Sequence, residues 1–356
     1  MGNSLKIFDA SYLVYVGTNS MRYNTNVKFG VNYGGLHFLC EKVFYNISIG
    51  NDVAVVFDSY TTKKLKFEEY KANRVPNAGI RIQLEILEEW LKKIGVAVFK
   101  EEGYEADDII KYLVDANTDY YSNIDIYSGD ADVYANIIRK GITVYGCSSK
   151  SPTVDSDNYA TVAKRGEIVP YNAILPYFLV FGKPSNNVPP LRLEATNNNM
   201  VIFKDIIGFF NKQNVPNCDR SSLKNIRLWQ LSKIGKLSAN DLQAVVKQIE
   251  LVYPKTTNNI DRFEYAQHRR SINKDAAIEF FAIFGLKLPA LNLGWNRDLE
   301  APKFNNVGVD RLKYYYNRMS SLYASESRGE IHLVSDSGTD EDDDYISSMI
   351  TTDSFQ

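Results

Sequence analysis

Short apolar segments that end in an acidic residue recur through the first 135 residues of the chain. Lys-Ile-Phe ends in Asp9, and Val-Ala-Val-Val-Phe ends in Asp58. More acidic side chains follow in Gly-Tyr-Glu-Ala-Asp-Asp (residues 103–108) and Ser-Gly-Asp-Ala-Asp (128–132). A carboxylate at the carboxyl end of a buried parallel strand points into the crevice where α/β proteins bind ligands. The candidate site residues are therefore Asp9, Asp58, Glu105, Asp107, Asp108, Asp130 and Asp132.

Converging carboxylates repel one another unless a cation neutralises them. Mg²⁺ prefers oxygen ligands and retains waters that leave room for substrate phosphates. The residue chemistry alone therefore favours a site for Mg²⁺, or Mn²⁺, that hydrolyses phosphodiesters. For any one of these residues, such as Asp58, the simpler alternative is a turn or helix-cap role.

The apolar segments alternate with helical patterns, which predicts a parallel sheet flanked by helices. The predicted strands cover residues 5–9, 53–58, 94–99, 124–128 and 141–145. Apolar residues at helical spacing predict helices over 81–93 and 104–115, and later over 171–181, 200–212, 226–234, 239–252 and 274–285. The expected fold class is α/β, with a parallel-sheet core and a helical C-terminal portion.

The change of pattern places a domain boundary near residue 190. We expect an α/β core over 1–190, a helical domain over 191–324 and a disordered acidic tail over 325–356. Eight acidic residues and no Lys or Arg lie between Glu330 and Gln356. Since the whole chain carries −2, residues 1–329 carry a formal +6, which is compatible with nucleic acid.

The cysteines are too few and too widely spaced for a disulfide framework or a zinc cluster. They are Cys40, Cys147 and Cys218. No signal peptide and no apolar run long enough to span a bilayer is recognisable. We expect a monomer in the cytoplasm, without membrane partners.

Five segments, in order, resemble the 5′→3′ exonuclease and flap endonuclease family, which includes the N-terminal nuclease of bacterial DNA polymerase I, phage exonucleases and RNase H-type primer-removal enzymes. The most specific are Gly-Tyr-Glu-Ala-Asp-Asp-Ile-Ile (103–110) and Tyr-Ser-Gly-Asp-Ala-Asp (127–132). Residues 7–12, 55–58 and 70–74 complete the set. The resemblance implies a PIN-like nuclease core that acts in DNA replication, in phage-encoded members within the host cytoplasm.

By this resemblance two groups of acids hold two metal ions. Asp9, Asp58, Glu105, Asp107 and Asp130 would surround the first ion, and Asp108 and Asp132 would face the second. The chain departs from the family pattern at residues 182–190, because Lys183 and Asn186 stand where two second-metal aspartates are expected. The second ion should bind poorly or be replaced by the Lys183 ammonium.

Basic residues follow the second predicted strand, and residues 70–74 among them resemble the basic segment of the family. These basic residues are Lys63, Lys64, Lys66, Lys71, Arg74 and Arg81. We expect these side chains to contact phosphates, the alternative being a solvated helix face.

The expected function is hydrolysis of DNA, or of RNA primers on DNA, at a 5′ end or flap. The alternative is a family member that binds DNA ends or a replication protein without cleaving. The acidic tail is a candidate surface for such a replication partner.

Overall fold

The protein is described from a computed structural model. The structure describes residues 4–20, 22, 27–28, 31–74, 77–147, 153–157, 169, 173–213, 225–226, 228–229, 237–255 and 272–286. The predicted acidic tail and most of the helix expected over 226–234 lie outside these residues.

Six strands form a mostly parallel sheet in the order β5-β4-β1-β6-β7-β8. They are β1 (Ser4–Asp9), β4 (Asp52–Val56), β5 (Ala97–Phe99), β6 (Asn123–Tyr127), β7 (Ile142–Tyr145) and β8 (Thr153–Val154). Strands β1 and β4, β4 and β5, and β6 and β7 pair in parallel, whereas β8 runs antiparallel to β7. A separate antiparallel pair joins β2 (Val27–Lys28) to β3 (Val31–Asn32). The predicted α/β fold with a mostly parallel sheet is confirmed.

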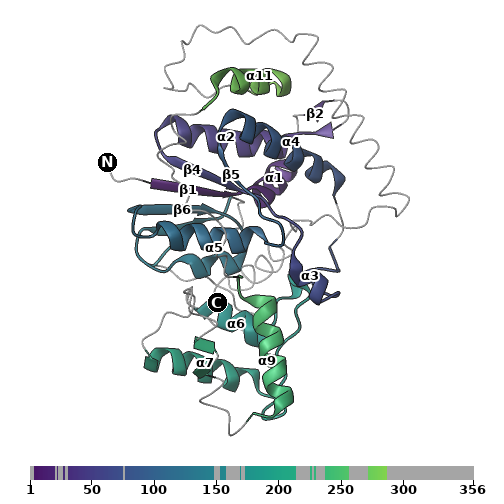
Figure 1. The fold of residues 1–356 in the computed structure, drawn as a ribbon, viewed down its shortest axis with the longest axis vertical. Helices are drawn as coiled ribbons and strands as arrows, with labels where there is room; N and C mark the ends of the chain where they lie inside the picture. Colours follow the sequence, from purple (N-terminus) through teal and green to yellow (C-terminus); the bar gives the residue numbers. More distant parts are fainter. Residues whose placement is uncertain are drawn as a thin grey trace, which may run out of the picture. The chain divides into compact units, whose positions relative to one another are not determined.

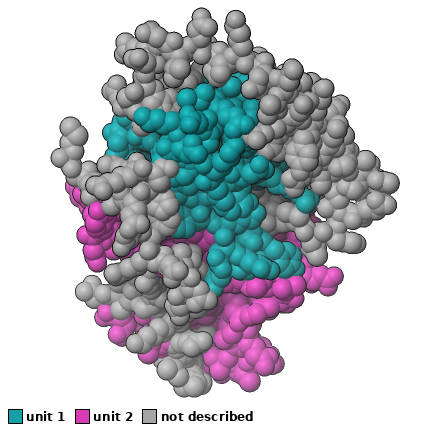
Figure 2. Space-filling view, turned by 45° about the horizontal axis from the view of Figure 1, so that its top comes forward, with its two compact units in different colours: residues 1–60, 75–106, 260–339 teal, residues 61–74, 107–259, 340–356 magenta. Residues whose placement is uncertain are grey.

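The chain divides into two compact units, each assembled from separate stretches of sequence (Figure 2). Unit 1 contains residues 1–60, 75–106 and 260–339, and unit 2 contains residues 61–74, 107–259 and 340–356. The domain boundaries expected near residues 190 and 324 stay a prediction.

In unit 1, β1, β4 and β5 lie with four helices. These are α1 (Ala10–Asn19), α2 (Gly34–Ser48), α4 (Ala78–Ile94) and α11 (Lys274–Phe284). All five residues of β4 are buried, as expected for a strand covered on both faces. Helices α1 and α2 approach so closely that a Cβ on Gly35 would lie 2.3 Å from the Val14 carbonyl oxygen. Glycine at this position therefore permits the contact.

Helix α11 packs beside α2 and α4, although it lies far from them in the sequence (Figure 1). The Phe280 ring stacks on Trp90 with centroids 5.3 Å apart, and Phe281 meets Phe44 edge-on at 4.8 Å. Aromatic pairs of this kind add to the free energy of burial. One helix of the expected C-terminal helical portion thus completes the core of unit 1.

Unit 2 holds the β6, β7 and β8 strands and most of the remaining helices. These are α3 (Thr62–Lys66), α5 (Ala106–Asn117), α6 (Ile174–Phe181), α7 (Asn199–Gln213), α9 (Ala239–Val252) and the 3-10 helices η1 (Ala131–Asn136) and η3 (Pro184–Asn186). The first residue of α5, Ala106, is assigned to unit 1. The apolar helix α6 contacts α7, α9 and η1. A capping box formed by Ser238 and Asp241 begins α9.

Among the described residues, no helix is both long enough and apolar enough to cross a membrane.

Candidate metal centre

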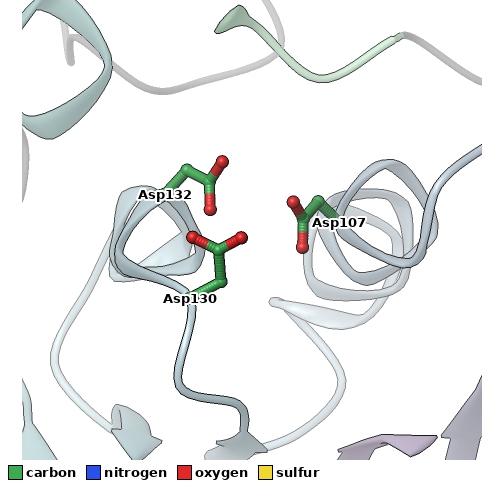
Figure 3. A group of neighbouring side chains, drawn as sticks. All are labelled: Asp107, Asp130 and Asp132. Carbon is green, nitrogen blue, oxygen red and sulfur yellow. The ribbon is translucent and has the colours of Figure 1, made fainter. Parts of the chain in front are cut away.

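Three of the predicted acidic residues come together in unit 2. One carboxylate oxygen from each of Asp107, Asp130 and Asp132 lies within 4.8 Å of the other two. Figure 3 shows that Asp130 and Asp132 approach from one helical turn and Asp107 from a second helix, with their carboxylates turned toward one another. These three residues, which come from two separate sequence motifs, therefore form one acidic group, which we call the aspartate triad.

Local structure explains how the triad is presented. Strand β6 ends at Tyr127, and Asp130 occupies the N-cap position of η1, where its N–H donates to Ser128 Oγ at 3.3 Å. Asp132 then falls in the first turn of η1, and Asp107 in the first turn of α5. Backbone N–H groups at a helix N-terminus favour negative charge, so these positions suit carboxylates.

Lys183 reaches the triad from the loop after α6. Its Nζ lies 2.5 Å from Asp130 Oδ1 and 2.9 Å from Asp132 Oδ2. The Lys183 side chain is 3% exposed, and those of Asp130 and Asp132 are 15% and 11% exposed. The contact is therefore largely buried, and replacement of a second metal ion by the Lys183 ammonium stays a prediction.

The pKa values of the triad reflect crowding of negative charge. Burial and the charge of Asp130 raise the pKa of Asp132 to about 8. Burial and the charges of Asp132 and Asp130 raise the pKa of Asp107, although Lys183 and Lys71 oppose the rise. Burial also opposes ionisation of Asp130, but the charge and hydrogen bond of Lys183 outweigh it and lower the pKa of that carboxyl. Lys183 thus favours the ionised form of Asp130, while the pKa values of Asp107 and Asp132 remain raised.

Asp108 is not part of the triad, although it is the next residue after Asp107. It is fully buried, and its Oδ1 accepts a hydrogen bond of 2.7 Å from the Lys255 backbone N–H, just beyond α9. Neighbouring positions on a helix point about 100° apart, so two adjacent aspartates serve different surroundings. In unit 2 Asp108 connects the start of α5 to the chain after α9.

The other predicted acids, Asp9, Asp58 and Glu105, belong to unit 1, and the first two lie at or just after the end of a strand. Asp9 is the last residue of β1 and caps α1 by accepting from the Tyr12 N–H at 3.2 Å. Asp58 follows β4, and its Oδ1 accepts from the Ala106 N–H at 2.8 Å, next to the buried Glu105. Because the two compact units are described separately, the convergence of all seven acids stays a prediction.

The predicted phosphate-contacting residues differ in their surroundings. Lys63 is buried with its Nζ 5.8 Å from the Tyr70 ring centroid, and Lys66 pairs with Glu250 at 3.3 Å. In unit 1, Arg81 lies 3.6 Å from Glu85 on the same helix. Lys64 is half-buried, and the remaining two residues of the set, Lys71 and Arg74, contact the loop that carries Lys183.

Sequence reasoning missed two contacts around this centre. Arg74 Nη2 donates to Asn186 Oδ1 at 2.7 Å across 112 residues, and the bond from Lys255 to Asp108 spans 147 residues. Nothing in the local pattern marks such partners. The only available signal was that Asn186 departs from the expected aspartate.

Part of the chain is similar in sequence to known proteins. Residues 4–165 match the model of the 5′-3′ exonuclease N-terminal, resolvase-like domain. The chain is 30% identical over 200 residues to DNA polymerase I of Caldicellulosiruptor bescii, covering 53% of this chain and 23% of that protein. It is 29% identical over 141 residues to a 5′-3′ exonuclease of Aquifex aeolicus, covering 38% of this chain and 46% of that protein.

Among solved structures, the T5 D15 protein co-crystallised with metal ions is similar at a TM-score of 0.46 and 13% identity, covering 79% of this chain and 98% of that one. The catalytic core of Rad2 in complex with DNA gives a TM-score of 0.40 and 12% identity, covering 80% and 93%.

Residues 4–165 are thus similar in sequence to the 5′-3′ exonuclease N-terminal, resolvase-like domain. The suspected resemblance is confirmed for this part of the chain. The chain spans less than half of the length of either curated relative described above.

Proposed function

We propose that this protein is a divalent-metal-dependent 5′ nuclease that hydrolyses phosphodiesters of DNA, or of RNA primers on DNA, at a free 5′ end or flap. The observation that carries the proposal is the aspartate triad, whose three carboxylate oxygens lie within 4.8 Å of one another in a chain that matches the 5′-3′ exonuclease N-terminal domain over residues 4–165. Asp9, Asp58 and Glu105 are predicted to add further oxygen ligands.

The triad fits a hard divalent cation such as Mg²⁺ or Mn²⁺. Its donors are all carboxylate oxygens, which these ions prefer. Among the described residues, Asp132 Oδ1 is buried and makes no hydrogen bond. A buried acceptor of this kind is costly unless a cation or water satisfies it. Burial and the charge of Asp130 raise the pKa of Asp132, and a bound cation would favour the ionised form of this carboxyl.

Asp107, Asp130 and Asp132 would hold the ion. When bound, such an ion lowers the pKa of a coordinated water and offsets charge on the phosphate and the leaving oxygen. Basic side chains of this protein would supply the remaining interactions. Lys183 keeps Asp130 ionised and places a fixed positive charge beside the triad, while Lys64, Lys71 and Arg74 bind substrate phosphates.

Lys183 supports one ion at the triad rather than two. Paired ions in nuclease sites lie roughly 4 Å apart and share carboxylates between them. Here Lys183 already donates to two of the three aspartates, so a second cation would have to displace an ammonium that makes two charge-assisted contacts. The proposed cofactor is therefore a single Mg²⁺ or Mn²⁺, with Lys183 supplying the other positive charge.

A nuclease assay on a labelled 5′-flap duplex tests the proposal. Cleavage with Mg²⁺ or Mn²⁺ and none with excess EDTA is expected, with products that shorten from the 5′ end or release the flap. Equal cleavage in EDTA would exclude a metal-dependent mechanism.

The second candidate is a protein that binds DNA ends without cleaving them. It is favoured by the same contacts of Lys183, because an ammonium held by Asp130 and Asp132 competes with a metal ion for their oxygens. Calorimetric titration with Mg²⁺ separates the two candidates. Binding of DNA without measurable Mg²⁺ binding or cleavage would support the second candidate.

A further inference from the structure

The loop that carries Lys183 and Asn186 is a small closed turn. Lys183 and Val188 exchange two backbone hydrogen bonds of 2.9 and 3.0 Å, and Asn187 closes the turn in a left-handed conformation. Gly182 has φ +78°, and a Cβ there would lie 2.4 Å from the Val188 carbonyl oxygen. Because this geometry leaves little freedom, the side chains of residues 183 and 186 have a fixed separation.

One end of the turn is bound to the aspartate triad through Lys183. The other end is bound to residues 69–74 by three hydrogen bonds. Asn186 accepts from Arg74 Nη2 at 2.7 Å through its Oδ1, and from the Lys71 N–H at 3.0 Å through its backbone oxygen. Asn187 Nδ2 donates to the Glu69 carbonyl at 2.9 Å. The turn therefore connects the acidic group to the basic residues, within unit 2.

Two features show that these contacts fix the basic residues in place. Lys71 has φ +53°, a conformation that a non-glycine residue adopts only where its surroundings impose it. Asn186 is 5% exposed, so its amide is held within the protein. An amide oxygen accepts a hydrogen bond from a guanidinium without adding negative charge, whereas a carboxylate would form an ion pair with it.

We propose that Asn186 is a positioning residue that holds Arg74 and Lys71 at a set place relative to the aspartate triad, so that a phosphate bound by these two basic side chains is aligned with the acidic group. The neutral amide positions Arg74 while adding no charge that would compete with phosphate. This inference rests on the proposed function, because it assigns the binding step of the same nucleic-acid substrate.

Two substitutions at residue 186 distinguish a loss of positioning of Arg74 from a change of charge beside it. Asn186→Asp keeps the size of the side chain but introduces an ion pair with Arg74, so the salt dependence of DNA binding should fall by about one unit of slope. Asn186→Ala removes the hydrogen bond but leaves the charge of Arg74. It should weaken DNA binding about tenfold, because one hydrogen bond to a charged group is lost. The slope of the salt dependence should change little.

Binding is measured by fluorescence anisotropy on a labelled 5′-flap duplex in EDTA across a range of salt concentrations, so cleavage is not required. Asn240→Asp is the matched control, because Asn240 is an exposed residue of unit 2 and the change adds the same charge. The control should keep the wild-type slope. Thermal melting checks that each variant folds.

The double variant Asn186→Ala with Arg74→Ala tests the contact itself. If the two residues act together, the double variant binds no more weakly than Arg74→Ala alone. Should an Asn186 variant fail to fold, Arg74→Gln probes the same bond from its other side and should also lower the slope by about one unit.

The outcomes distinguish the two proposals. Wild-type cleavage with unchanged affinity and slope in both Asn186 variants would overturn this inference and leave the proposed nuclease intact. Additive losses in the double variant would overturn it as well. A wild-type protein that neither binds nor cleaves the flap duplex would overturn both.

Discussion

The Lys183 ammonium lies 2.5 Å from Asp130 Oδ1, at the centre of an otherwise acidic group. The same Nζ is 2.9 Å from Asp132 Oδ2, so one positive charge serves two carboxylates. A charge-assisted bridge of this kind can stabilise the protein without a metal ion, and it can also oppose binding of an ion.

Replacing Lys183 with Met should destabilise the metal-free protein and strengthen its response to Mg²⁺. Breaking a largely buried ion pair leaves uncompensated charge and costs roughly 3 kcal/mol. Mg²⁺ then has two carboxylates to neutralise without an ammonium in its way. Thermal melts in EDTA and in Mg²⁺ should give a lower melting temperature in EDTA and a larger rise on adding Mg²⁺. Lys140→Met serves as control, because Lys140 is 86% exposed. An unchanged rise in Lys183→Met would show that Lys183 does not compete with the ion.

The metal-free protein should lose stability as pH rises. Burial and the charge of Asp130 raise the pKa of Asp132 from 3.8 to about 8, so between these values the folded state holds a proton that the unfolded chain has released. The free energy of unfolding therefore decreases as pH rises from about 5 to about 8. The lowered pKa of Asp130 has the opposite sign but acts only in acid. Urea unfolding at several pH values in EDTA measures the slope, which should flatten in Asp132→Asn.

Asp107→Asn should abolish most of the Mg²⁺ response. It removes one ligand of the triad and relieves repulsion, so the variant should melt at a higher temperature than wild type in EDTA while losing Mg²⁺ affinity in calorimetry. Cleavage should fall by orders of magnitude while binding of flap DNA persists. Asp157→Asn, with a side chain 75% exposed, is the control and should behave as wild type. Full activity of Asp107→Asn would remove this aspartate from the proposed centre.

Neutralising Lys64 and Lys71 together should weaken DNA binding equally for all sequences. Phosphate contacts release counterions, so the salt dependence should fall by about one unit of slope for each lost contact. Lys140→Gln should not change the slope. If the slope of Lys64→Gln with Lys71→Gln equals that of wild type, these side chains form a solvated surface instead.

Asp108 should prove structural rather than metal-binding. Asp108→Ala removes the acceptor of the Lys255 N–H and should cost about 1–3 kcal/mol in urea unfolding. Asp108→Asn keeps an acceptor oxygen, so it should retain Mg²⁺ affinity and most of the stability. A loss of Mg²⁺ affinity in Asp108→Asn as large as that in Asp107→Asn would instead assign Asp108 to the ion.

The sequence by itself determined the strands and the residues that end them. Apolar segments terminated by Asp9 and Asp58 predicted two strands, of which one ends at Asp9 and the other ends just before Asp58, because strand periodicity and burial are local properties of the chain. The Asp130 and Asp132 motif likewise predicted a close pair. The departure at Lys183 and Asn186 could be seen from the sequence as well, since it is a change of residue type within a recognisable segment.

Only the tertiary structure decided which groups meet. The sequence does not distinguish the adjacent residues Asp107 and Asp108. In the structure Asp107 belongs to the triad, whereas Asp108 accepts a hydrogen bond from the Lys255 N–H. Helix α11 follows the predicted helical portion along the chain but packs on Trp90 in the core of unit 1. Such contacts join residues more than a hundred positions apart, and no local pattern encodes them. They are selected by the burial of complementary apolar and charged surfaces when the whole chain folds.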